Sequence, residues 1–143
     1  MTVILTARER RELQAAIGAA ERGHRGEIRV HLENRYLGDG PRRRAEALFH
    51  ELGLDRTRDG TGVLLYVAER DRKTAVFAGP GVYGARTPGF WSDVAATIAD
   101  GYATGERMTG LLRGLAMIGE ILRDAAPGED TAGDELPNEV TTT

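Results

Sequence analysis

Two carboxylates in this chain stand where a divalent cation could be bound. Asp59 lies before a glycine-flanked apolar run, and Glu27 opens a segment of alternating residues. Carboxylates, backbone carbonyls and water are the ligands that Ca²⁺ and Mg²⁺ take in proteins. An aspartate before glycine is also common as a turn residue that hydrogen-bonds its own backbone. Both interpretations of Asp59 stay open at this point.

A second polar group comes from residues 27–33, where every other side chain is charged or an imidazole. The side chains on this face are those of Glu27, Arg29, His31 and Glu33. The face could line a polar cleft in which His31 acts as acid or base, because histidine titrates near neutral pH. The pattern favours instead a ladder of paired neighbours on a partly open edge strand.

The elements that must position these residues follow from hydrophobic periodicity. Residues 63–68 are apolar at both parities, as in a strand covered on both faces, and residues 73–78 form a second run after a charged turn. This spacing predicts an antiparallel hairpin at the centre of the fold, ending in a turn at residues 79–81. Residues 27–33 alternate with period two and predict one more strand.

Helices are predicted around these strands. They lie between Thr6 and Gly23, at about residues 42–52, from Pro88 onward and at about residues 106–125. The order strand, helix, strand predicts a right-handed βαβ unit with parallel strands. The expected fold class is therefore α/β: a three-layer α/β/α sandwich, in which a small mixed sheet of the parallel unit and the antiparallel hairpin has helices on both faces. Both carboxylates and the turn at residues 79–81 would then lie at one end of the sheet.

Length and composition limit the class of protein. The 143 residues are 41% hydrophobic and 29% charged, and they include no cysteine, so we expect one soluble, cytoplasmic domain over residues 1–127. No stretch approaches the roughly 20 apolar residues of a membrane span. Residues 128–143 are expected to be an acidic, mobile tail in which Leu136 and Val140 could dock locally. Removing the tail's five acids from a net charge of −3 leaves only +2, too little for a nucleic-acid surface.

The run DGTGVLLYVAERDRKTAVFAGPGV, at residues 59–82, resembles the TPM domain. The shared pattern is an Asp-x-Gly opening, an apolar strand, a charged turn that ends in Asp-Arg, and a Gly-x-Gly exit. GEIRVHLE, AEALFHELGL, the helix start at Pro88 and the late DELPNEV are similar to the short, stand-alone branch of that family. The resemblance implies a mixed sheet between helices, divalent-cation binding, phosphatase-like activity on small phosphate compounds, and a link to the assembly or repair of membrane complexes.

Carried onto this chain, the resemblance makes Asp59 the acid of the opening and Gly79 and Gly81 the exit. Many members have acids just after that exit, where this sequence has Val-Tyr-Gly-Ala at residues 82–85. Because Ca²⁺ takes six or more oxygen ligands, the expected site for Ca²⁺ or Mg²⁺ at Asp59 and Glu27 is weak. No organic cofactor is expected.

Two functions follow as alternatives. The first is a non-catalytic interaction or accessory module, with the acidic tail and the arginines at 42–44 as contact surfaces for an unknown protein or a membrane-associated complex. The second is a divalent-cation-dependent phosphatase, a phosphohydrolase acting on small phosphate esters or nucleotides, in which a weakly held cation neutralises phosphate charge. The missing acids favour the first.

Overall fold

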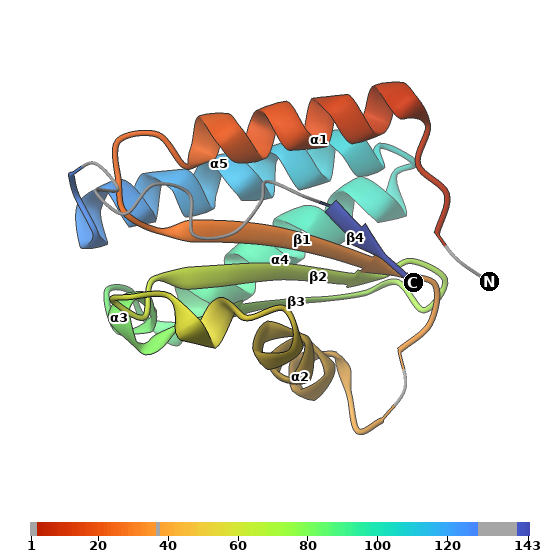
Figure 1. Cartoon of the computed structure of the whole chain (residues 1–143). Helices are drawn as coiled ribbons and strands as arrows, with labels where there is room; N and C mark the ends of the chain where they lie inside the picture. Colours follow the sequence, from red (N-terminus) through yellow and green to blue (C-terminus); the bar gives the residue numbers. More distant parts are fainter. Residues whose placement is uncertain (1–2, 37, 129–139) are drawn as a thin grey trace.

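One four-stranded sheet, in the order β3-β2-β1-β4, is formed by the residues that the computed structural model describes, 3–36, 38–128 and 140–143 (Figure 1). Its strands are β1 (Glu27–Glu33), β2 (Gly62–Ala68), β3 (Lys73–Ala78) and β4 (Val140–Thr142). β1 and β2 are parallel, as the βαβ unit requires, and β3 is antiparallel to β2. The expected mixed sheet is confirmed.

Helices cover both faces of this sheet (Figure 1). One face packs against α1 (Ala7–Ala20), α4 (Pro88–Ala103) and α5 (Arg107–Ala125), and the other against α2 (Pro41–Glu51) and the short 3₁₀ turn η1 (Leu54–Arg56). The larger core lies under α1, α4 and α5. It takes alternate residues of β1 and β2, namely Ile28, Val30, Leu32, Val63, Leu65 and Val67. The α/β/α sandwich predicted from the sequence is therefore present.

The central strand is β2. All seven of its residues are buried, Leu65 toward the larger core and Tyr66 toward α2, which confirms the prediction from its apolar pattern. β3 lies at the edge of the sheet and is only partly buried. Only β2 of the predicted hairpin is therefore at the centre of the sheet, and β3 is at its edge.

Local signals explain where the helices begin and how they pack. The Thr6 hydroxyl accepts a bond from the Glu9 N–H (3.0 Å), and the Glu9 carboxylate accepts one from the Thr6 N–H (2.9 Å), so the expected capping box begins α1. Pro88 begins α4 as expected. α4 and α5 cross at Gly101 and Gly110, where a Cβ on Gly101 would lie 2.7 Å from the Cα of Gly110.

The C-terminal residues and β1 differ from expectation. Residues 128–143 were expected to form a mobile tail in which Val140 could dock locally. Val140 does dock, because Val140–Thr142 form β4, which pairs with Val30, His31 and Leu32 of β1. β1 is therefore an interior strand, buried along its whole length, and the expectation of a partly open edge strand is wrong. Leu136 lies outside the described residues. The turn at 79–81 also continues as a short helix, α3 (Pro80–Tyr83).

No helix in the part of the chain that the structure describes is both long and apolar enough to cross a membrane.

Candidate functional site

The strand ends expected to meet do meet. The Gly79 N–H donates to the Gly62 carbonyl (2.8 Å), and the Gly81 N–H donates to the Gly60 carbonyl (2.8 Å). A side chain on Gly81 would collide with the carbonyl oxygen of Asp59, so only glycine allows this close approach. We call this region the Asp59 end of the sheet.

Asp59 already has a cationic partner at this end. A guanidinium nitrogen of Arg25 lies 2.6 Å from Asp59 Oδ2, and both side chains are about two-fifths exposed. Glu27, the other candidate ligand, is only 3% exposed. Among the described residues, no three His, Asp or Glu side chains gather closely enough to hold a metal ion. The donors for Ca²⁺ or Mg²⁺ are therefore few, and Arg25 competes with a cation for Asp59.

The polar face of β1 forms a buried network around Glu33. Arg44 of α2 donates two hydrogen bonds to the Glu33 carboxylate (2.7 and 3.1 Å), the Tyr66 hydroxyl donates another, and the Thr143 hydroxyl a further one (3.1 Å). Burial alone would raise the pKa of Glu33, but the bonds from Arg44 and Tyr66 outweigh it and lower that pKa. The carboxylate is therefore held ionised between β1, α2 and β2.

His31 ties the same face to the C-terminal strand. Its Nδ1 lies 2.6 Å from the Thr141 hydroxyl, its Nε2 lies 3.0 Å from the Thr143 hydroxyl, and its ring stacks on Tyr66. Burial is the main cause that lowers the pKa of His31. Both ring nitrogens are occupied, so this geometry suits a neutral imidazole that joins two strands.

Two of the candidate residues, His31 and Glu33, are thus joined in one network, in which Arg44 reaches across from α2 and β4 lies beside β1 in the sheet. Arg29 is 6% exposed, and its Nε has no hydrogen-bond partner among the described residues. The partners that organise this face were missed from the sequence; they are Arg44, Tyr66, Thr141 and Thr143. One signal was available, because Tyr66 places a hydroxyl inside an apolar run and a buried hydroxyl needs a partner.

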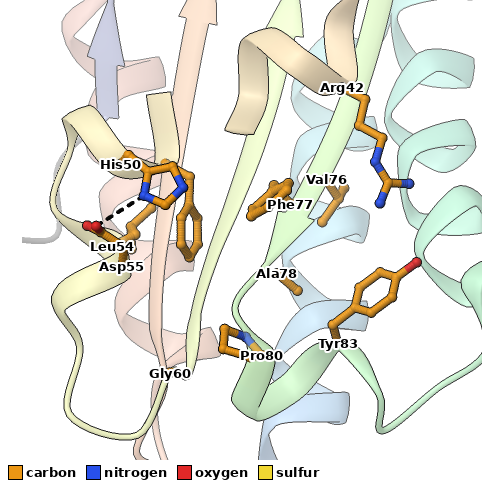
Figure 2. A pocket seen from close by; sticks show the side chains of 11 residues that line it. Arg42, His50, Leu54, Asp55, Gly60, Val76, Phe77, Ala78, Pro80 and Tyr83 are labelled. Carbon is orange, nitrogen blue, oxygen red and sulfur yellow. Dashed lines mark ion pairs between the residues drawn. The ribbon is translucent and has the colours of Figure 1, made fainter. Parts of the chain in front are cut away.

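A cavity of about 470 Å³, unforeseen from the sequence, lies along β3 (Figure 2). We call it the β3 groove. It is lined by Arg42, Phe49, His50, Leu54, Asp55, Gly60, Val76, Phe77, Ala78, Pro80 and Tyr83. Figure 2 shows Val76, Phe77 and Ala78 between two walls, with His50 and Asp55 on one side and Arg42 and Tyr83 on the other.

The walls of the β3 groove are held by specific contacts. Phe77 meets Phe49 of α2 edge to face, with ring centroids 4.9 Å apart. His50 Nδ1 lies 3.0 Å from Asp55 Oδ2, which joins α2 to η1. On the opposite wall, the Trp91 indole donates to the Tyr83 carbonyl (3.0 Å). The groove is therefore a mostly apolar recess between anchored elements, which suits binding of an apolar group.

Comparison with known proteins agrees with this architecture. The TPM domain family matches residues 1–121. The NMR structure of BA42 from the psychrophilic bacterium Bizionia argentinensis is similar, with 33% identity, a TM-score of 0.85, and coverage of 97% of this chain and 95% of that one. No curated protein matches.

Two more distant structures share the fold. The N-terminal domain of a P. gingivalis protein has 17% identity and a TM-score of 0.71, over 85% of this chain and 78% of that one. The N-terminal domain of cg2496 from Corynebacterium glutamicum has 13% identity and a TM-score of 0.65, over 87% and 78%. On the family match and the likeness to BA42, the chain belongs to the TPM domain family.

Proposed function

We propose that this TPM domain is a non-catalytic interaction module that binds a protein partner in the β3 groove. The observation that carries the proposal is the groove itself, an apolar recess of about 470 Å³ between α2 and α3. Recesses of this size, lined by aromatic side chains with a few polar groups, are where proteins take up ligands and partner side chains. Phe49, Phe77 and Tyr83 provide the aromatic surface.

The chemistry at the Asp59 end supports the same proposal. Phosphoryl transfer depends on cations and donors that neutralise phosphate charge. Asp59 is engaged by Arg25, and residues 82–85 supply no acid to strengthen a cation site. Any binding of Ca²⁺ or Mg²⁺ there would be weak.

The alternative function is a divalent-cation-dependent phosphatase for small phosphate esters or nucleotides. One observation favours it: Asp59 lies beside the Gly79–Gly81 turn, at the end of the sheet where Glu27 begins β1. A cation held there would face solvent at the partly exposed Asp59 carboxylate. We rank this alternative second because the described donors are few.

Peptide selection tests the interaction function directly. A random peptide library displayed on phage is selected against the purified domain, and binders are then measured on two variants. Tyr83→Ser, in the groove wall, should weaken them, whereas Tyr36→Ser, a partly buried tyrosine that does not line the groove, should not. Failure to select any peptide that depends on Tyr83 would contradict the proposal.

An activity assay tests the alternative. The domain and its Asp59→Asn variant are each incubated with p-nitrophenyl phosphate and either Mg²⁺ or Ca²⁺. We expect no turnover above background in either protein. Cation-dependent turnover that disappears in Asp59→Asn would establish the phosphatase instead.

A further inference from the structure

We propose that the partner binds as an added β-strand: an extended, acidic segment of another protein pairs with the outer edge of β3. This inference rests on the interaction function proposed above and specifies the class of partner. It is carried by the hydrogen-bond register of β3, by the position of the β3 groove across that strand, and by the charges around it.

The register shows which backbone groups of β3 are unused. The Gly79 N–H bonds to the Gly62 carbonyl, so residues 79, 77, 75 and 73 are the ones that exchange hydrogen bonds with β2 in an antiparallel ladder. The N–H and carbonyl groups of Thr74, Val76 and Ala78 then point away from β2. β3 has no other strand beside it among the described residues. A row of backbone donors and acceptors is therefore open to an extended chain.

The β3 groove lies across this open edge rather than over one face of the sheet. Phe77 belongs to the core under α2, whereas Val76 and Ala78 belong to the core under α4 and α5. All three residues line the one cavity. A strand added to β3 would therefore place alternate side chains against the two walls, His50 and Asp55 on one side and Arg42 and Tyr83 on the other (Figure 2).

The walls also favour a single segment over a second copy of this chain. His50 and Asp55 border the groove on one side of β3, and Arg42 and Tyr83 border it on the other (Figure 2). A second copy that paired through its own β3 would bring the same two walls against these. An isolated extended segment carries no such walls, so it can enter the groove along its length.

The charges around the edge favour acidic residues in the partner. Arg42 lines the groove and makes no ion pair within the described part of the chain, and Lys73, exposed at the start of β3, makes none there either. Lys73 is three residues from Val76, about 10 Å along the strand. Asp55, the acid in the groove, is already paired with His50. An extended segment of six or so residues would meet both cations.

A synthetic peptide tests this pairing. The probe is an acetylated, amidated heptapeptide in which aspartate alternates with valine or phenylalanine, titrated into the ¹⁵N-labelled full chain and followed by NMR. Two further peptides carry N-methyl groups on one or the other alternate set of amides. One set faces β3 and the other faces solvent, so one methylated peptide should bind at least about 10-fold more weakly and the other about as well as the parent.

Variants of the protein separate pairing from charge. Val76→Pro removes one outward N–H without touching the ladder to β2, and it should weaken the parent peptide about fivefold while the amide spectrum stays dispersed. Arg42→Glu should weaken it about 3-fold to 10-fold. Arg43→Glu is the matched control, because Arg43 lies outside the groove and is paired with Asp39 on the surface, so binding should change less than about 2-fold.

The outcomes separate the two proposals. If selected peptides need Tyr83 but both methylated probes bind like the parent, strand addition is wrong while the interaction function stands. If neither the probe nor any selected peptide binds at millimolar concentration, both proposals fall. If a peptide with lysine in place of each aspartate binds as well as the parent peptide, the inference that the partner segment is acidic is wrong. A concentration-dependent dimer that Val76→Pro dissociates would show that a second copy occupies the edge.

Discussion

The two edges of the sheet are finished in opposite ways. At one edge, β4 pairs with β1, the His31 ring contacts the hydroxyls of Thr141 and Thr143, and the Arg10 guanidinium donates to the Val140 carbonyl (2.9 Å). At the other edge, β3 offers its outer backbone groups to a mostly apolar groove. Proteins commonly protect sheet edges, because an open edge pairs with other chains.

The contrast also separates the chemistry of the molecule. Its buried ionic residues lie at the closed side, where Glu33 and Arg44 join β1 to α2. The open side is mostly apolar and keeps one cation, Arg42, at the groove wall. Charged groups that are buried and paired restrain a structure, whereas an apolar recess beside unpaired backbone groups is suited to a partner. The difference fits the proposal that β3 makes the contact with a partner, whereas the polar face of β1 serves the fold.

The largest effect is expected between the two edges, in β2. Leu65→Ala removes a fully buried side chain and should lower the free energy of unfolding by about 2–5 kcal/mol. Val76→Ala, on the partly exposed edge strand, should cost about 1 kcal/mol. Urea denaturation measures both. Equal losses would mean that β3 is buried as deeply as β2, and the open edge would then not exist.

The Glu33–Arg44 pair should come next. Glu33→Gln leaves the Arg44 guanidinium without its anion in a largely buried position, so a loss of about 2–3 kcal/mol is expected from urea denaturation. Arg43→Gln is the control, because its pair with Asp39 is exposed and should contribute less than about 0.5 kcal/mol. Similar small losses in the two variants would show that the closed side does not depend on its charges.

Removal of β4 tests the closed edge itself. Deleting residues 140–143 takes away the bond from the Thr143 N–H to the Leu32 carbonyl and both hydroxyl partners of His31. A loss of about 2 kcal/mol, or about 4–8 °C in Tm, is expected by calorimetry. The sequence alone predicted a mobile tail, so an unchanged Tm would show that the pairing of β4 with β1 adds little to stability.

The closed edge should also respond to pH through His31. Burial lowers its pKa below the ordinary 6.5, so the unfolded chain takes up protons first as the pH falls, and stability is present above pH 6.5 and lost below it. His24 is also buried, and burial lowers its pKa too, so it contributes to the pH dependence in the same direction. The measurement is therefore the difference between the wild type and His31→Asn. From pH 7 to pH 5, the free energy of unfolding should fall less in His31→Asn than in the wild type. Identical pH profiles would show that His31 is not a source of the pH dependence.

The contrast between the edges explains what sequence reasoning could find. β2 was predictable because burial on both faces demands apolar residues at both parities, and α1 because Thr6 and Glu9 form a local capping pattern. β4 was not, because Val-Thr-Thr is three residues long and follows a polar stretch without periodicity. Its place depends on pairing with β1 more than a hundred residues earlier.

The candidate sites divide in the same way. The meeting of Asp59 with the Gly79–Gly81 turn followed from strand direction alone, so it could be predicted. The partners Arg25 and Arg44 are set by side-chain directions after folding, and no spacing rule points to them. The β3 groove needs the relative placement of α2 and α3, which periodicity does not contain.

The smallest effect is expected at the Asp59 end, which belongs to neither edge. With one partly exposed carboxylate held by Arg25, Ca²⁺ should bind with a Kd on the order of 10⁻⁴–10⁻³ M or more weakly. Asp59→Asn should remove this binding in an NMR titration.

Arg25→Gln should tighten Ca²⁺ binding about 2-fold to 5-fold, because the competing guanidinium is gone and the carboxylate is free to take the ion. Arg22→Gln is a control for the loss of one positive charge, since Arg22 has no ion pair among the described residues and belongs to the turn after α1. Equal Ca²⁺ responses in wild type, Asp59→Asn and Arg25→Gln would place any cation site elsewhere.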